Sequence, residues 1–206
     1  MGPDETHDVS ESWSQWRAVT DLEEYFTRWQ RLDEAGQSPH GEADFIESLQ
    51  PASVFDAGCG MGRVAIELVR RGIDVVGVDL DDDLLEYARR SEPSIRWVHA
   101  DLATVRLGRR FDVVAMPGNV MIFCRPSDRG RIISNVSAHL EDDGLLVAGF
   151  ELRRTAGAVT LDEYDLLCSA CGLALVQRYS TWQGDDYGDE AYAVSVHRRA
   201  APHSQP

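Results

Sequence analysis

The sequence lacks a long hydrophobic run and is short of positive charge, and each absence excludes a class of function. No stretch approaches the roughly 18 consecutive apolar residues of a membrane-spanning helix, so no membrane span is expected. Lys and Arg number 20 against 35 Asp and Glu, which gives a net charge of −15 and an isoelectric point near 4.7. Because nucleic-acid binding rests on clustered Lys and Arg, this charge argues against nucleic acids and anionic membranes as partners.

Cysteine is scarce as well, with four residues in a chain of 206. Four scattered cysteines do not make a disulfide scaffold. Cys168 and Cys171 form a Cys-x-x-Cys pair in a predicted helix over 161–171, but no second Cys/His pair completes a tetrahedral metal site. We therefore interpret the pair as core packing and expect no metal. The polar, acidic N-terminus has no secretory pattern, so the expected location is cytoplasmic.

The length and a hydrophobic fraction of 43% suit one globular domain. Residues 1–12 are expected to be disordered, 13–41 to form a helical cap, and 42–200 to form the main domain. Within the cap, apolar residues at helical spacing predict an amphipathic helix over 22–32 with Asp21 as its N-cap.

From residue 53 onward, predicted strands alternate with predicted helices. This order indicates a parallel sheet with right-handed crossovers. The last two strands are joined by a segment too short for a crossover helix, so they should pair antiparallel. The predicted strands are 53–57, 73–79, 95–99, 111–116, 144–151, 174–182 and 191–198, and the helices between them are 63–71, 82–90, 127–140 and 160–171.

The most informative segment is Val54 to Arg63, where an apolar strand runs into Asp56 and then into glycines at 58, 60 and 62. Glycines at this spacing let the backbone turn tightly, so that a ligand can lie against the main chain. The helix that opens near Arg63 points its free N–H groups at the same place. This geometry favours a nucleotide-type cofactor at the carboxyl edge of a parallel sheet.

Further candidate site residues follow the next strands at regular intervals. Asp79 ends the second strand, where its carboxylate can accept hydrogen bonds from both hydroxyls of a ribose. Asp101 and Leu102 follow the third strand, and the fourth runs into Pro117-Gly118-Asn119. Simpler interpretations remain, because aspartates are common in turns and at helix N-caps.

The acid followed by Gly-x-Gly-x-Gly, with these later acids, resembles the motifs of class I S-adenosylmethionine-dependent methyltransferases. The resemblance implies a Rossmann-like, doubly wound, mostly parallel seven-stranded sheet with an antiparallel last strand and an N-terminal helical cap. It also implies S-adenosyl-L-methionine as cofactor and S-adenosyl-L-homocysteine as product. By the same resemblance, the ammonium would be bound by Asp56, the amino-acid part by Gly58, Cys59 and Gly60, the ribose by Asp79, the adenine by Leu80, Asp101 and Leu102, the methionine chain by Met116, Gly118 and Asn119, and the carboxylate by His40.

The motifs specify the cofactor but not the methyl acceptor. We expect a small-molecule acceptor with an O, N or C nucleophile, because the Asn/Asp-Pro-Pro-Tyr/Phe tetrapeptide of nucleic-acid amino-methylating enzymes is absent after the fourth strand. No residue is assigned as catalytic, and the oligomeric state is not indicated. His40 has an alternative role as the start of a helix. Two other functions stay open: an NAD-dependent oxidoreductase, which the glycine register and the terminal hairpin oppose, and a non-catalytic S-adenosylmethionine-binding protein.

The residues before 42 are predicted to form a lid over the cofactor. The helix over 22–32 carries an apolar stripe and must pack on something. Its exit leads directly to the strand that feeds the glycine loop, which brings it close to the carboxyl edge. A cover at that edge would exclude water and complete an acceptor pocket.

Overall fold

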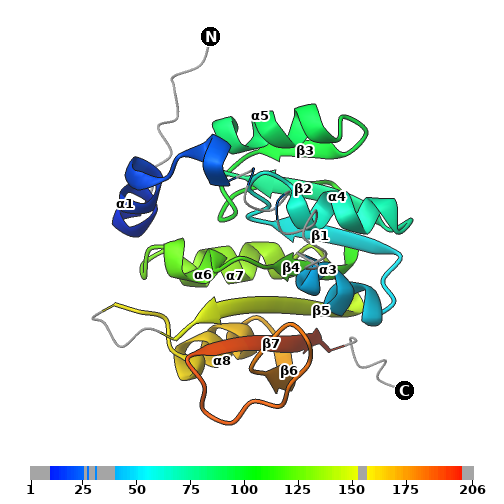
Figure 1. Cartoon of the computed structure of the whole chain (residues 1–206). Helices are drawn as coiled ribbons and strands as arrows, with labels where there is room; N and C mark the ends of the chain where they lie inside the picture. The colour runs from blue at the N-terminus through cyan, green and yellow to red at the C-terminus, as the bar shows by residue number, and fades with distance from the viewer. Residues whose placement is uncertain (1–9, 26, 28–30, 32–39, 153–156, 201–206) are drawn as a thin grey trace.

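The fold is a single sheet with helices on both faces (Figure 1). The computed structural model describes residues 10–25, 27, 31, 40–152 and 157–200. Among the described residues, no helix is both long and apolar enough to cross a membrane. In chain order the elements are α1 (Glu11–Val19), α3 (Gly41–Ser48), β1 (Ser53–Ala57), α4 (Arg63–Arg70), β2 (Asp74–Asp79), α5 (Asp82–Ser91), β3 (Arg96–His99), β4 (Phe111–Met116), α6 (Val120–Phe123), α7 (Arg129–Ser137), β5 (Leu140–Glu151), α8 (Leu161–Ala170), β6 (Leu173–Tyr179) and β7 (Tyr192–Arg199).

The seven strands have the order β3-β2-β1-β4-β5-β7-β6. The first five strands along the chain pair parallel, while β7 pairs antiparallel with both β5 and β6. This topology confirms the predicted mostly parallel sheet with an antiparallel last strand. The sheet order reverses direction between β1 and β4, and open α/β sheets bind ligands in the crevice at such a switch point.

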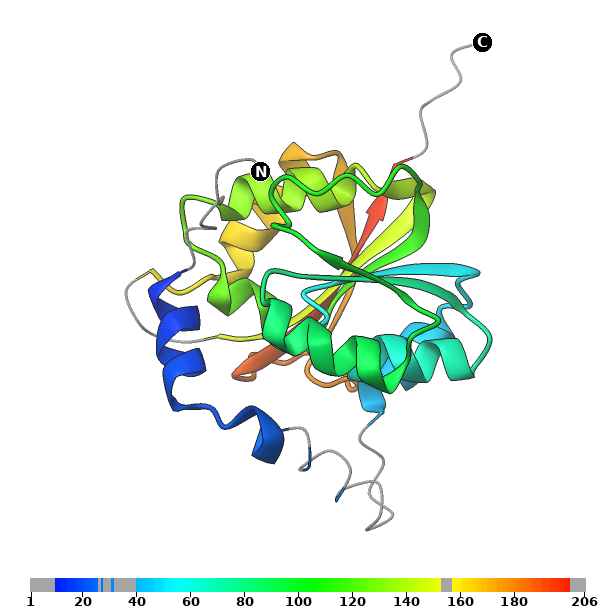
Figure 2. The ribbon, with the colours of Figure 1, turned by 90° about the horizontal axis from the view of Figure 1, so that it is seen from above.

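Two hydrophobic cores hold the helices on the sheet, one on each face. Figure 2 shows α7 and α8 on one side of the sheet and α3, α4 and α5 on the other. The first core joins residues such as Phe55 and Phe150 of the sheet to Ile133 of α7 and Tyr164 of α8. The second joins β-branched strand residues to α3 and α4. Parallel strands buried on both faces explain why β1, β2 and β4 read as nearly continuous apolar runs.

Two boundaries differ from the sequence prediction at the α7–β5 junction. Helix α7 covers Arg129–Ser137 rather than 127–140, and β5 begins at Leu140 rather than 144. Leu140 pairs with Phe111, and the register then shifts before Val113 pairs with Leu145. This bulge inserts extra residues into β5, including Asp143 with a positive φ of 63°. Residues that tolerate this conformation are typical of turns, so the sequence predicted the strand to begin only at 144.

The N-terminal region begins with a helix that the sequence prediction of a disordered tail over 1–12 does not include. Helix α1 starts at Glu11, and the Ser10 hydroxyl accepts a hydrogen bond from the Trp13 amide at 3.0 Å, which caps it. Residues 22–25 are helical, and Asp21 accepts from the amides of Glu23 and Glu24, so its predicted capping role is confirmed. The greater part of the predicted helix 22–32 lies outside the described residues.

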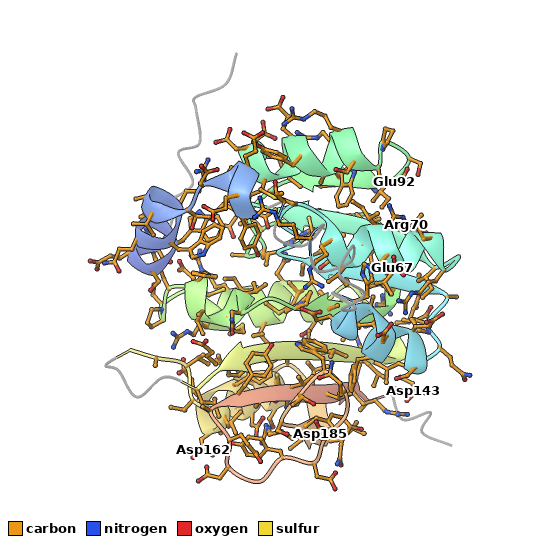
Figure 3. All side chains as sticks on the ribbon, viewed as in Figure 1. Glu67, Arg70, Glu92, Asp143, Asp162 and Asp185 are labelled. Carbon is orange, nitrogen blue, oxygen red and sulfur yellow. The ribbon has the colours of Figure 1, made fainter. Side chains whose placement is uncertain are left out.

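The acidic excess is carried by the outer surface. The exposed carboxylates Asp143, Asp162 and Asp185 lie at the periphery, in the bulged start of β5, the first turn of α8 and the loop before β7 (Figure 3). Among the described residues, two carboxylates are buried, Asp56 and Asp79, and they lie at the carboxyl ends of β1 and β2.

Candidate functional site

The glycine loop between β1 and α4 turns under the carboxyl edge of the sheet. Gly58, Gly60 and Gly62 all have positive φ (83°, 54° and 81°), which explains the need for glycine at alternate positions. The amides of Gly58 and Cys59 donate to the Val78 carbonyl at 2.8 and 3.0 Å, which fastens the loop to β2. Helix α4 then starts with its N-terminus facing the same edge.

The glycines differ in what surrounds them. A Cβ on Gly58 would lie 2.6 Å from a Val120 methyl, and one on Gly62 would lie 2.4 Å from the Trp97 ring, so both glycines permit close packing. A Cβ on Gly60 would meet only a Leu84 methyl, at 3.9 Å. The backbone at Gly60 therefore faces open space, which a ligand can occupy.

Asp56 is a buried carboxylate without a partner. Its side chain is 0% exposed, and neither carboxylate oxygen has a hydrogen-bond partner among the described residues. Burial raises the pKa of Asp56 from 3.8 to about 7, the charge of Arg63 opposes this rise, and Asp79 adds to it. Because an isolated ionised carboxylate is costly to bury, this site is suited to a cationic group.

Asp79 ties the glycine loop to the end of β2. One carboxylate oxygen accepts from the Gly60 amide at 2.7 Å and the other accepts from the Asp81 amide at 2.9 Å. Burial raises the pKa of Asp79 to about 6, and these amide hydrogen bonds partly offset that rise. A carboxylate oxygen can accept more than one hydrogen bond, so Asp79, which lines the cavity, holds the loop and still has capacity to accept hydrogen bonds from a ligand.

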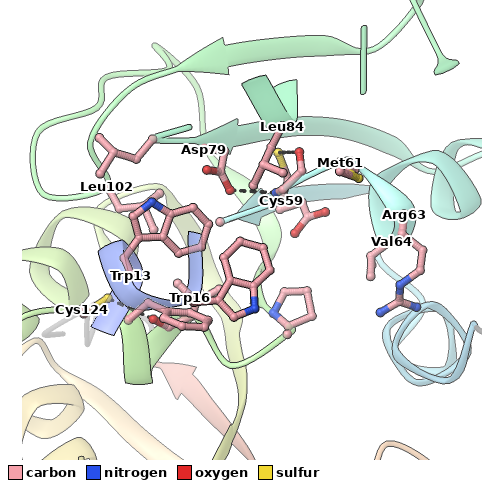
Figure 4. Close-up of a pocket in the computed structure, with 18 of the residues that line it drawn as sticks. Trp13, Trp16, Cys59, Met61, Arg63, Val64, Asp79, Leu84, Leu102 and Cys124 are labelled. Carbon is pink, nitrogen blue, oxygen red and sulfur yellow. Dashed lines mark hydrogen bonds between the residues drawn. The ribbon is translucent and has the colours of Figure 1, made fainter. Parts of the chain in front are cut away.

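A cavity of about 740 Å³ opens where these groups meet (Figure 4). Its volume is in the upper part of the usual range for small-molecule sites, about 300–1,000 Å³. The structure brings most of the predicted site residues to its wall: Asp56, Gly58, Cys59, Gly60, Asp79, Leu80, Asp101, Leu102, Gly118 and His40. Among the described residues, no group of three or more His, Cys, Asp or Glu could hold a metal ion.

Met116 and Asn119, by contrast, are not among the residues that line the cavity. Met116 is fully buried in the core between the sheet and α7. Asn119 adopts a positive φ of 69°, and its side-chain oxygen accepts from the Glu151 amide at 2.8 Å. The structure therefore gives both side chains supporting positions, behind the wall formed by Pro117 and Gly118.

The remaining predicted residues have local partners as well. Asp101 accepts from the Ala103 amide at 2.8 Å in a tight turn, with Leu102 buried beside it. His40 is the N-cap residue of α3, and its ring lies 3.8 Å from a Glu67 carboxylate oxygen. The simple roles as a turn residue and as the start of a helix thus coexist with a place on the cavity wall.

The sequence interpretation missed Trp13, Trp16 and Arg63 of the cavity wall. Trp13 and Trp16 of α1 enter the cavity from the segment assigned to a tail and cap, and Phe123 of α6 meets them there. The spacing of the two tryptophans, three residues apart, was the available signal. Arg63 also lines the cavity and is held by Glu42 of α3, with one N–O distance of 3.0 Å.

The known proteins that resemble this chain are methyltransferases. A family model described as a methyltransferase domain matches residues 54–144. A magnesium-protoporphyrin O-methyltransferase of Rhodobacter capsulatus is 38% identical over 95 residues, which are 44% of this chain and 42% of that protein. A dTDP-3-amino-3,4,6-trideoxy-alpha-D-glucopyranose N,N-dimethyltransferase of Streptomyces venezuelae is 31% identical over 108 residues, 51% of this chain and 46% of that protein. The chain thus spans less than half the length of these two curated relatives.

A solved structure matches over nearly its whole length. The TehB-like SAM-dependent methyltransferase of Corynebacterium glutamicum is 32% identical, with a TM-score of 0.78. The match covers 86% of this chain and 97% of that one. With the family motifs at the cavity wall, this relationship shows that the chain belongs to the class I S-adenosylmethionine-dependent methyltransferases, whose cofactor is S-adenosyl-L-methionine.

Proposed function

We propose that this protein transfers a methyl group from S-adenosyl-L-methionine to a small-molecule acceptor. The observation that carries the proposal is the buried, unpartnered carboxylate of Asp56 on the wall of a cavity whose floor is the open backbone at Gly60. A cofactor with an ammonium group fits both features, since it would supply the missing positive charge and fill the space above the glycine.

The wall residues divide naturally among the parts of the cofactor. Asp56 would bind the ammonium, and the backbone from Gly58 to Gly60 would lie against the amino-acid part. Asp79, whose oxygens already accept from two backbone amides, would use its remaining lone pairs for the ribose hydroxyls. At the ends of β2 and β3, the adenine would lie among Leu80, Asp101 and Leu102.

The methionine chain would pass the end of β4. Gly118 is the candidate contact there, while Met116 and Asn119 would act from behind by fixing the loop. His40 is the candidate partner of the cofactor carboxylate, since it lines the same cavity as the glycine loop.

The bound cofactor supplies a methyl group on a sulfonium, which is already activated for transfer. The tasks left to the protein are to align the acceptor and to exclude water. This agrees with a site in which the motif residues hold the cofactor and no residue is assigned as a general base.

A small-molecule acceptor is supported by the charge of the chain and by the names of its relatives. A net charge of −15 disfavours polyanionic substrates. The two curated relatives are named for a metalloporphyrin and a nucleotide-linked amino sugar. Both names denote small molecules, with an oxygen and a nitrogen acceptor respectively, and the nucleophile of this chain is not decided by them.

The test is formation of S-adenosylhomocysteine from S-adenosylmethionine across a library of small acceptors, followed by mass spectrometry. Turnover with at least one acceptor, lost in Gly60→Val, is the expected result. Calorimetric binding of the cofactor without turnover across a broad library would instead indicate a non-catalytic cofactor-binding protein. Absence of cofactor binding would overturn the proposal.

A further inference from the structure

Helix α1 places two large aromatic side chains over the cavity instead of in a core. None of its residues is buried, yet Trp13 and Trp16 are only partly exposed and both line the cavity. Figure 4 shows their rings extending from α1 toward the space beside Asp79 and Leu102. Large aromatic side chains at a cavity mouth, with no core behind them, are typical of a ligand-binding surface.

The two tryptophans and Phe123 form one continuous surface, which we call the aromatic wall. The rings of Trp13 and Trp16 stack with centroids 4.8 Å apart. Phe123 meets Trp13 edge-on at 5.3 Å and lies 5.9 Å from Trp16. At these separations the rings touch one another, so no space remains between them for a cation. The geometry is that of a wall against which a flat molecule can stack, rather than a cage around an ammonium group.

One end of the aromatic wall, Phe123, lies on the β4 side of the cavity. Phe123 ends α6, which follows directly after β4, and Cys124 and Ile132 line the cavity next to it. The residues proposed for the adenine follow β2 and β3. The wall therefore runs from Leu102, beside the Trp13 ring (Figure 4), to Phe123 at the end of β4, where the methionine chain would pass.

A second set of contacts fixes α1 in this place. Arg17 binds Asp81 at 3.1 Å and Asp83 at 2.6 Å, at the start of α5. Asp81 also caps α5 and donates its amide to Asp79. The helix that carries the two tryptophans is thus joined to the loop that holds the proposed ribose ligand.

Two charged groups that flank the aromatic wall, Arg17 and Asp128, are already paired. Arg17 has its two aspartates, and Asp128 binds Arg131 at 2.8 Å. The Cys124 thiol donates to the Val120 carbonyl at 3.3 Å, and burial raises its pKa to about 12, so it is neutral at physiological pH. The wall itself offers apolar area and ring faces, and Arg17, Asp128 and Cys124 add no unpaired charge to it.

We propose that the aromatic wall of Trp13, Trp16 and Phe123 is the acceptor subsite, and that it takes an uncharged, planar ring compound that carries the nucleophile. This inference rests on the proposed function, since an acceptor subsite presupposes methyl transfer. It adds a substrate class and assigns Arg17 as a positioning residue that keeps the tryptophans in the cavity.

The experiment measures binding and turnover separately. Binding of 2-naphthol and 4-hydroxyindole, as planar uncharged probes, is measured by calorimetry on protein saturated with S-adenosylhomocysteine. Ethanolamine and glucosamine serve as amine probes. Methyl transfer from S-adenosylmethionine to the same compounds is followed by mass spectrometry.

Trp13→Leu and Trp16→Leu should each weaken binding of the planar probes about tenfold, because the stacking surface is lost, and should leave the affinity for S-adenosylhomocysteine unchanged. Val19→Ala, at an exposed position of the same helix, is the matched control and should change neither affinity. Arg17→Met keeps both rings but removes the ion pairs, and should raise KM for a planar acceptor more than it lowers kcat. It also serves as the second test if a tryptophan variant does not fold.

Four results would overturn the inference. The planar probes do not bind, or only the amines bind or are methylated. The tryptophan variants lose affinity for S-adenosylhomocysteine by the same factor as for the planar probes, which would assign the wall to the cofactor. Arg17→Met leaves KM unchanged. Because cofactor binding is measured independently, failure of the subsite is distinguishable from failure of the proposed function.

Discussion

Replacement of Asp56 by asparagine should stabilise the ligand-free protein and weaken cofactor binding, two effects of opposite sign. A pKa raised from 3.8 to about 7 means that the ionised carboxylate costs the folded state about 4 kcal/mol at pH 8. A buried asparagine amide without partners costs about 1–3 kcal/mol. Because a buried protonated carboxyl without partners carries a similar cost, the net gain in unfolding free energy is about 4 kcal/mol at most.

The pH dependence gives this prediction its signature. The folded state keeps the Asp56 proton up to about pH 7, whereas the unfolded chain releases it near pH 4. Between these values the folded state binds more protons, so the stability of the wild type falls as pH rises and levels off above about pH 7. The advantage of the asparagine variant should shrink when the pH is lowered from 8 to 5.

Denaturant unfolding of the ligand-free protein at both pH values tests the stability, and calorimetry with S-adenosylhomocysteine tests the binding. Loss of a charge-assisted hydrogen bond of about 1.5–3 kcal/mol should weaken binding about ten- to hundredfold. Asp142→Asn, an exposed carboxylate 3.6 Å from Arg110, is the control and should change neither quantity. A variant that is less stable than the wild type at pH 8, or that binds as tightly, would refute the assignment of Asp56.

Three further outcomes are expected. Asp79→Ala should weaken S-adenosylmethionine binding, measured by calorimetry, at least about tenfold. Because Asp79 also accepts a hydrogen bond from the Gly60 amide, the melting temperature should fall as well. Unchanged affinity would exclude the ribose role. Gly60→Val should abolish binding with a native circular dichroism spectrum. Gly184→Val, at a residue that also has a positive φ (85°) but lies outside the cavity wall, should bind normally; normal binding by the first variant would reduce the loop to a structural turn. S-adenosylhomocysteine should slow hydrogen exchange over residues 10–25 as well as in the glycine loop, and exchange in 10–25 that ignores the ligand would show that α1 is not part of a lid.

The sequence predicted those parts of the site that local chemistry determines. Asp56, Asp79 and the three glycines are fixed by the junctions of strand, loop and helix, where positive φ and buried strand ends restrict the residue types. Their spacing along the chain is enough to place them at one edge, because parallel strands bring their carboxyl ends together.

The parts that failed depend on tertiary packing. Side chains alternate between faces along a strand and its extension, so the same run after β4 sends Met116 into the core and brings Pro117 to the cavity. Trp13 and Trp16 belong to a short helix whose stability depends on contacts with Phe123, Asp81 and other distant residues. A short amphipathic segment gives little periodic signal of its own.

The two sides of the cavity mouth are fastened by different forces. Helix α6 is fixed to β5 by hydrogen bonds between uncharged groups, since the Asn119 amide donates to the Gly149 carbonyl and its side chain accepts from Glu151. Helix α1 is joined to α5 by Arg17, whose side chain is 31% exposed; those of its partners Asp81 and Asp83 are 11% and 69% exposed. Exposed ion pairs contribute only about 0.2–1 kcal/mol, and dissolved salt screens them. Ionic strength therefore weakens the attachment of α1 to α5, and the affinity for an acceptor should fall with added salt while the glycine loop stays in place.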